Sequence, residues 1–510
     1  MLSRVFLILI WICFWSHTFS QNKIHLLPGS EIAEYDQSTG IHKLYRNVKF
    51  ESQDNTIYCD SAIFNENTNH IRSFGNVHIQ KESINIFCDS FDYQTKREYA
   101  KLWGNVRGRD LEYKISSDSM EYDLKTGMAL FKNKGRIESI VSDERISSQK
   151  GYFYPKTKDF FFSGDVRYAK KTFYITTDTL QYQYAKQTAI FFGPTQITND
   201  SVEITCNSGY YDIREDVGKI WNKACIKKKE IYAQSDTLEY NSKDNSIRCL
   251  GNAFYKDDSL FMKVKASSIF HSDSSAVSLA KGRAIIEKVM DKDTLVFIAD
   301  SLVLIKDSVN SLDKIQGFYH VEIHHKNFEA IGDSGFYSAK TKEFTLQENP
   351  ILWSKNIEFK ARYFKLFLND STIDSLYMED KSSIIAEIDS LKEYYNQLYG
   401  NKMNVKFKNS KITQSIIEGN ALSIYFPEDK KMQDSTFQKT RYGVNKLVSS
   451  ELNIYFKENE IYRVSYINQP EGKFTPFSKI KKSDCFGEQF KVSFQLRPTY
   501  QKPEEFQLIL

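Results

Sequence analysis

The sequence has little proline and little cysteine. Nine prolines stand beside 31 tyrosines and 37 phenylalanines among 510 residues, a balance that favours β-strands. The seven cysteines include no CxxC pair, which excludes a zinc site of that spacing. Beyond the first twenty residues no apolar run approaches the roughly eighteen residues of a membrane-spanning helix, so we expect the rest of the chain to be soluble.

An excess of one charge and the common catalytic motifs are also missing. Lys and Arg total 69 against 65 Asp and Glu, a net charge of +4, and no basic block stands out. Nucleic acid is therefore not an expected partner. The sequence contains no GxSxG, P-loop or HExxH motif. We predict no catalytic residues, no cofactor and no enzymatic activity.

Residues 1–20 have the pattern of a secretory signal peptide. Arg4 precedes an apolar run over residues 5–14, and the stretch ends in Ser20 ahead of Gln21. A basic start, a short apolar run and a small residue at the end are typical of such a peptide, and the run is too short to span a bilayer. The sequence predicts an exported protein, with an uncleaved signal anchor as the alternative.

What is present is a repeat. A small residue, an anchor that is usually Asp, and alternating apolar and aromatic positions return about every 29 residues. The anchors are Asp60, Asp89, Asp118, Gln149, Asp178, Asn207, Asp236, Ser267, Asp300, Asp333 and Arg362. Such a period indicates stacked units that bury their apolar faces against each other. We predict an elongated all-β repeat domain over residues 21–370.

Apolar residues form columns at fixed distances from the anchors. They stand three positions before and two positions after, so the parity of the apolar positions changes at each anchor. A bulge at each anchor would restore both halves of the strand to one interior face, and the anchor Asp would then bond backbone N–H groups at that corner. The candidate lining residues of the interior are Ile57, Ile86, Phe91, Ile115, Met120, Ile146, Ile175, Leu180, Ile204, Leu238, Ile269, Phe297 and Leu302.

Three cysteines occupy the small position before an anchor. Cys59, Cys88 and Cys206 stand where other repeats have Ser, Thr or Ala, so buried free thiols are the expected state. If each repeat formed one rung, Cys59 and Cys88 would lie on adjacent rungs about 4.8 Å apart. A disulfide between them is the alternative.

The repeat fades after Arg362. Apolar residues between positions 383 and 398 have a helical spacing, and we predict a short helix there. Residues 406–412 are echoed by residues 455–461, which indicates a second block over residues 371–480. Residues 481–510 form a C-terminal tail without a strong pattern.

The recurring motifs resemble those of the OstA-like (LptA/OstA) family of periplasmic lipopolysaccharide-transport proteins, here in a long variant. The matching segments are Gly75-Asn76-Val77, Gly104-Asn105-Val106, Cys88-Asp89-Ser90-Phe91 and Ser235-Asp236-Thr237-Leu238, and the likeness extends over residues 32–477. The resemblance implies an open β-jellyroll, in which two layers of strands meet in a V around an apolar groove. It also implies that the groove holds the acyl chains of lipid A.

The resemblance further implies a periplasmic protein, in association with the outer membrane or free of it, that carries or bridges lipopolysaccharide or a related glycolipid. Other β-jellyroll components would join it end to end by strand pairing. A homo-oligomer formed in the same way is the alternative. Two other classes remain: a closed β-solenoid with a structural or adhesive role, and a polysaccharide-processing β-helix enzyme. His320, Glu322 and His324 alternate along one strand, but we interpret them as an exposed polar face and predict no metal site.

Overall fold

The computed structural model describes residues 24–500 apart from 53–54, 124, 155–156, 158, 184, 213, 273, 291–292, 308–310, 370–371, 390–391, 434–435 and 458–459. The predicted signal peptide and the last ten residues lie outside this part of the chain. The chain forms two compact units: one holds the residues up to Lys229 and Gln234–Lys243, and the other holds Glu230–Ala233 and the residues from Asp244. In the described part of the chain, no helix is long and apolar enough to cross a membrane.

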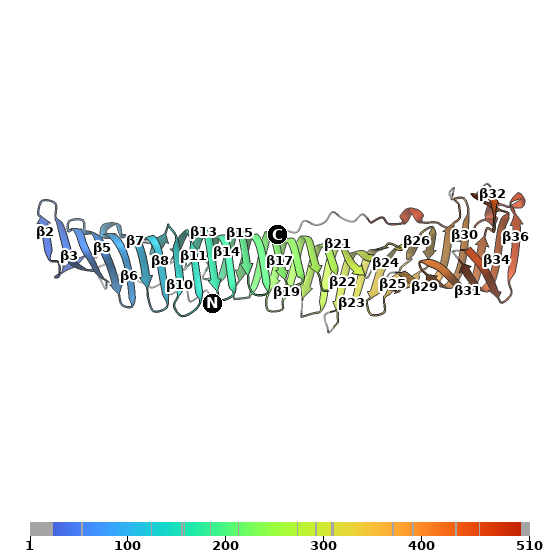
Figure 1. Ribbon diagram of the computed structural model, residues 1–510, viewed down its shortest axis with the longest axis horizontal. Helices are drawn as coiled ribbons and strands as arrows, with labels where there is room; N and C mark the ends of the chain where they lie inside the picture. The colour runs from blue at the N-terminus through green and yellow to red at the C-terminus, as the bar shows by residue number, and fades with distance from the viewer. Residues whose placement is uncertain are drawn as a thin grey trace. The chain divides into compact units, whose positions relative to one another are not determined.

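Both units consist of antiparallel strands, which confirms the all-β prediction (Figure 1). The strands of the first unit are β1 (His25–Leu27), β2 (Ile32–Asp36), β3 (Ile41–Ser52), β4 (Asn55–Asn65), β5 (His70–Lys81), β6 (Ile84–Gln94), β7 (Tyr99–Arg109), β8 (Tyr113–Asp123), β9 (Met128–Phe131), β10 (Gly135–Ser139), β11 (Glu144–Ser148), β12 (Lys150–Tyr154), β13 (Asp159–Lys170), β14 (Phe173–Gln183), β15 (Thr188–Thr198), β16 (Val202–Asp212) and β17 (Val217–Lys228). Strand β18 (Ile231–Asn241) contributes residues to both units.

The second unit continues in the same way. Its strands are β19 (Ser246–Asp257), β20 (Met262–Ser272), β21 (Val277–Met290), β22 (Asp293–Lys306), β23 (Leu312–His325), β24 (Phe328–Ser338), β25 (Glu343–Gln347), β26 (Ile351–Ser354), β27 (Ile357–Lys360), β28 (Tyr363–Asn369), β29 (Thr372–Glu387), β30 (Tyr395–Lys408), β31 (Lys411–Tyr425), β32 (Glu428–Gln433), β33 (Thr436–Arg441), β34 (Gly443–Lys457), β35 (Glu460–Ile467) and β36 (Glu471–Pro476). Short 3-10 turns are η1 (Thr95–Arg97), η2 (Phe477–Lys479), η3 (Lys482–Asp484) and η4 (Phe494–Leu496).

Each repeat of about 29 residues is a hairpin of two strands, and the strands follow one another as a meander. Strand β5 pairs with β4 on one side and with β6 on the other. One repeat therefore advances by two strand spacings, about 9.6 Å, and the single rung assumed from the sequence is wrong. Because β5 lies between Cys59 on β4 and Cys88 on β6, these thiols are not on neighbouring strands, and both are buried and free.

The predicted bulge at the anchors is confirmed. In β4 the buried residues are Ile57 and Cys59 before the anchor Asp60 and Ala62 and Phe64 after it, and the register with β5 shifts at this point. The bulge brings both halves of the strand to the same interior face. The predicted bond from the anchor to a backbone N–H takes another form, since the side-chain amide of Asn76 donates to the Asp60 carboxylate at 2.8 Å.

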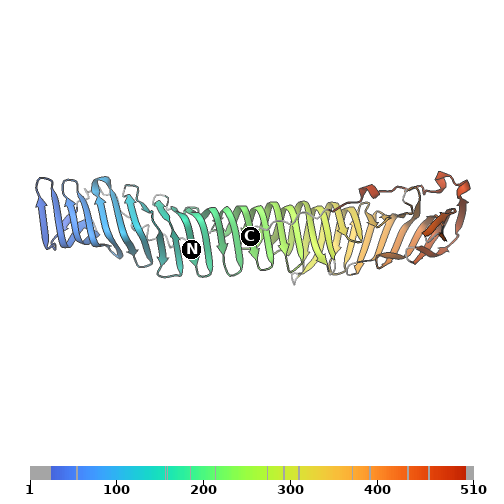
Figure 2. The same cartoon turned by 45° about the horizontal axis from the view of Figure 1, so that its top comes forward.

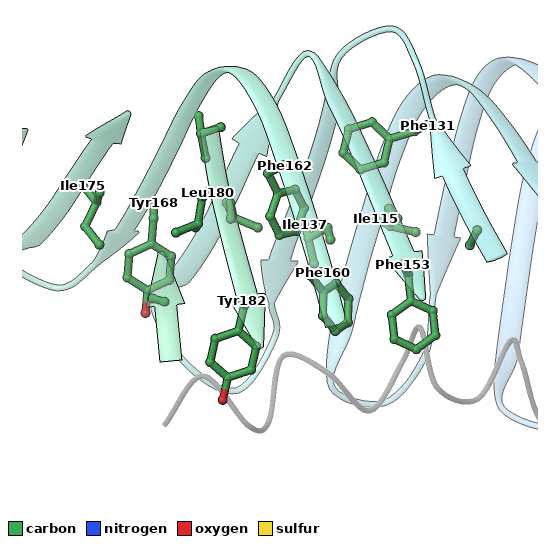
Figure 3. Packing of buried hydrophobic residues seen from close by; sticks show 14 of the residues in the cluster. Ile115, Phe131, Ile137, Phe153, Phe160, Phe162, Tyr168, Ile175, Leu180 and Tyr182 are labelled. Atoms are coloured by element: carbon green, nitrogen blue, oxygen red, sulfur yellow. The ribbon is translucent and has the colours of Figure 1, made fainter. Parts of the chain in front are cut away.

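The bulges bend the strands, so that side chains from both halves of a strand meet in a shared interior. In β13, Phe160 and Phe162 lie before the bulge and Val166 and Tyr168 lie after it, yet all four belong to one buried cluster. Their neighbours point into the same interior (Figure 3). The two halves of each strand thus form the two facing walls of the repeat.

A glycine at the bulge makes this bend possible, and its replacement should be costly. Gly282 has a φ of +84°, and a Cβ atom added there would lie 2.6 Å from Cβ of the anchor Ser267. We expect Gly282→Ala to lower the free energy of unfolding of the second unit by about 2 kcal/mol. Gly332→Ala is the matched control, because its nearest neighbour would lie 3.4 Å away. Urea denaturation measures both, and equal stability of the two variants would contradict the prediction.

The helix predicted over residues 383–398 is wrong. Residues up to Glu387 belong to β29, which pairs with β27 and with β30, and β30 begins at Tyr395. Ile384 and Ile385 are neighbours that point to opposite faces of the sheet, and both are buried. Apolar residues on both faces of a strand produce doublets that resemble helical spacing.

The predicted boundary at residue 370 falls within the second unit. Strand β28 ends at Asn369, and it pairs with β29, which begins at Thr372. The pairing of strands therefore continues across this position. The two compact units divide earlier, between residues 229 and 244.

Candidate binding site in the interior

The lining residues proposed from the sequence lie on the interior columns of the strands. All are buried except Ile86, Met120 and Ile204, which are half-buried. Those of the first unit up to Leu180 pack into clusters that include side chains from both walls. These residues therefore belong to the core of each unit.

The interior of the first unit is closely packed. A cavity of only about 20 Å³ lies between Ile146, Phe160, Leu180 and their neighbours. Figure 3 shows the side chains of Phe160 and Leu180 among the surrounding core residues. Tyr168 lines this cavity and donates a 2.5 Å hydrogen bond to the buried carboxylate of Glu144. Burial, together with this bond to Glu144, raises the pKa of Tyr168, so its hydroxyl keeps its proton.

At the start of the second unit an ion pair joins the two walls. Asp257 ends β19 in one wall, and Lys306 ends β22 in the other, and their charged groups are 3.2 Å apart. The carboxylate also accepts bonds from the Ser259 hydroxyl and the Leu260 N–H. The interior is bridged at the ends of these strands, away from the bulges.

The interior widens in the last strands of the second unit. A cavity of about 670 Å³ is lined on one wall by Phe359 of β27, Ile384 of β29 and Leu398 of β30. The facing residues are Phe407, Ile412, Phe456 and Ile461, and Ser415 and Ser423 add hydroxyl groups. The rings of Phe359 and Phe407 approach across the interior to 6.1 Å between centroids. This volume lies in the range of ligand-binding pockets, about 300–1,000 Å³.

The sequence-based candidates stop at Leu302 and miss this cavity. Phe359 stands three residues before the anchor Arg362, so the column rule itself reaches the first lining residue. The facing residues Phe407, Ile412, Phe456 and Ile461 lie in the segments 406–412 and 455–461 that echo each other, a signal that the column rule does not use. The difference in cavity volume between the two units depends on how the side chains pack. The columns of apolar residues in the sequence do not indicate it.

The three residues considered for zinc have other partners. Nδ1 of His320 lies 2.7 Å from the Asp300 carboxylate. Glu322 binds Arg283, and His324 lies 3.3 Å from the second oxygen of Glu322. A bulge between Phe318 and Val321 separates His320 from the regular alternation of the other two. Side-chain contacts on the sheet account for all three, and the exposed polar face expected from the sequence is wrong for His324, which is buried.

Comparison with known proteins agrees with this fold. Residues 22–178 match the OstA-like protein family, and residues 145–277 match the family described as LptA/(LptD N-terminal domain) LPS transport protein. Comparison with curated proteins gives no match. One similar solved structure is that of LptH, the LptA homologous periplasmic component of the lipopolysaccharide transport device from Pseudomonas aeruginosa. The match covers 21% of this chain and 80% of that chain, at 11% identity and a TM-score of 0.20.

The two family matches overlap over residues 145–178, and together they cover eight of the eleven anchors, from Asp60 to Ser267. The antiparallel strands with a common apolar interior are those of a β-jellyroll. Over residues 22–277 the chain thus carries OstA-like and LptA-like domains, which belong to the families of lipopolysaccharide-transport proteins.

Proposed function

We propose that this protein is a non-enzymatic, periplasmic lipid-binding protein that carries or bridges lipopolysaccharide toward the outer membrane. The family matches support the transport role, and the cavity of about 670 Å³, with Phe359, Leu398 and Phe407 in its lining, supports lipid binding. Acyl chains would enter this cavity between Phe359, Leu398 and the facing aromatic residues. Each buried methylene contributes about 0.8 kcal/mol, so lipid can be held without specific polar contacts.

The interior columns of both units extend this proposal. Residues such as Phe91 and Leu180 would contact acyl chains when the walls of their unit separate to admit lipid. The partly exposed Ile86, Met120 and Ile204 would be contacted first, because lipid reaches them without a full separation of the walls. The sequence-based lining residues thus remain candidates for contact with lipid.

Strand pairing would join the protein to other β-jellyroll components or to a second copy. Within the described residues, β35 and β36 both pair with β34, and their other edges carry no strand. An open strand edge is a template for the addition of a further strand. We propose that transport components associate through this edge.

Site-specific photo-crosslinking tests lipid binding. The photoreactive residue p-benzoylphenylalanine is placed at Leu398 in the cavity, at Phe91 and Leu180 in the first unit, and at the exposed Glu418 as a control. Purified lipopolysaccharide should be captured most strongly at Leu398 and not at Glu418. Capture at none of the interior positions would contradict the proposal.

A closed structural protein is the second candidate, and the packing of the first unit favours it. The cavity of about 20 Å³ and the ion pair between Asp257 and Lys306 are what a sealed interior would show. The photo-crosslinking experiment distinguishes the lipid-binding protein from the closed structural protein. In a closed structural protein, lipid would label none of the interior crosslinkers.

A further inference from the structure

The described part of the C-terminal tail runs back across the strands of the second unit (Figure 2). Gln397 of β30 bonds the backbone of Cys485 and Gly487, and Glu358 of β27 accepts from the N–H of Ser493. Arg497 binds Glu329 of β24, and the Tyr500 hydroxyl donates to Glu287 of β21. As the tail advances, its partners come from successively earlier strands, so the tail crosses the sheet as one extended segment.

The partners of the tail form one row across the sheet. Strand register places these residues opposite one another from strand to strand: Glu287, Val296, His324, Glu329, Trp353, Glu358, Ile385 and Gln397. The row faces away from the interior, because side chains alternate along a strand. Glu358, Ile385 and Gln397 each stand next to one of the cavity residues Phe359, Ile384 and Leu398. The tail and most of the cavity lining therefore lie on opposite faces of the same wall, and Gln397 borders both.

The row is built to hold a main chain. The Glu358 side chain is fully buried and accepts bonds from the N–H of Ser493 at 2.8 Å and from the indole N–H of Trp353 at 3.0 Å, and it pairs with Lys360. The Gln397 amide is also fully buried, donating to the Cys485 carbonyl at 2.8 Å and accepting from the Gly487 N–H at 3.0 Å. Buried polar groups of this kind are costly without partners, which the tail provides.

The tail crosses the wall where the wall has the shortest strands. In this wall β27 pairs with β29 over four residues, from Ile357 to Lys360, whereas β29 pairs with β30 over six, from Ser382 to Glu387. Short strands have few ladder hydrogen bonds to hold them. Arg497 adds bonds at this point, to Glu329 at 2.6 and 2.9 Å and to the carbonyl of Lys355, in the turn between β26 and β27, at 2.7 Å. The tail reinforces the part of the wall that its own strands hold least.

We propose that residues 491–500 are a strap that holds this wall of the cavity in its lipid-binding shape. The inference rests on the proposed function and concerns the regulation of that same site. With the strap in place the wall keeps its curvature, and the cavity stays open to acyl chains. When the strap is released, β26 and β27 move more freely, and the apolar lining residues fold into the empty space.

A shortened chain and a peptide test the strap. A chain ending at Phe490 keeps the buried cluster around Cys485 and loses Ser493, Arg497 and Tyr500. We expect it to bind fluorescent lipopolysaccharide roughly fivefold more weakly than the full chain. A synthetic peptide of residues 491–500 should restore the affinity. Arg497→Ala should have part of the effect, and substitution of the neighbouring exposed Gln495 by Ala should have none.

Amide hydrogen exchange tests, in the absence of lipid, whether the strap holds the wall. Amides of β26, β27 and β29 should exchange faster in the shortened chain, and the peptide should slow them again. Unchanged exchange in these strands, or an affinity equal to that of the full chain, would overturn the strap. Failure of the full chain to bind lipopolysaccharide would instead overturn the proposed function, and the exchange comparison would still show whether the tail holds the wall.

Discussion

Replacing Ser423 with tryptophan should lower the affinity for lipopolysaccharide about tenfold while the protein stays folded. Ser423 is buried, lines the cavity of about 670 Å³ and lies opposite Leu398 on the neighbouring strand. An indole ring at this position would occupy space otherwise open to an acyl chain. Exclusion of two methylenes forfeits about 1.6 kcal/mol, which corresponds to roughly a tenfold loss of affinity.

A tryptophan on the outside of the same strand is the matched control. Glu418 is exposed on β31, so Glu418→Trp adds the same ring without filling the cavity. Titration with fluorescent lipopolysaccharide gives both affinities, and urea denaturation shows that both variants are folded. If Ser423→Trp bound lipid as tightly as Glu418→Trp, the cavity would not be the site of the acyl chains.

Substitution of Lys306 by methionine should destabilise the second unit by about 3–5 kcal/mol. The Asp257 side chain is only 2% exposed, and the Lys306 ammonium, 3.2 Å away, is the partner of its charge. Methionine retains most of the length of the side chain and removes that charge. The cost arises because a buried carboxylate loses its ion-pair partner, and the midpoint of urea denaturation measures it.

The double variant Lys306→Met, Asp257→Asn separates the loss of charge pairing from the loss of packing. Asparagine is neutral and can still accept bonds from Ser259 and the Leu260 N–H. We expect it to recover most of the stability lost in Lys306→Met. A double variant as unstable as the single one would indicate that packing of the lysine stem, and not its charge, holds the two walls together.

Local patterning explains the successful predictions from the sequence. The change of parity at anchors such as Asp60 predicts the bulge, because a strand can bury residues on both sides of the anchor only if it bends there. The interior columns follow from the same alternation. The wrong prediction of a helix over residues 383–398 arises where this alternation fails. Ile385 is buried on the outer face of the sheet beside Ile384 on the inner face, so two neighbouring apolar residues replace the alternating pattern.

The amino-acid sequence by itself determined the strands, the bulges and the identity of most interior residues, because each depends on neighbours within one repeat. Tertiary structure alone decided where the interior is filled and where it is wide, since cavity volume depends on how side chains of both walls meet. It also decided the place of the tail. Glu358 and Ser493 are separated by 135 residues, and a contact between such distant positions leaves no period in the sequence.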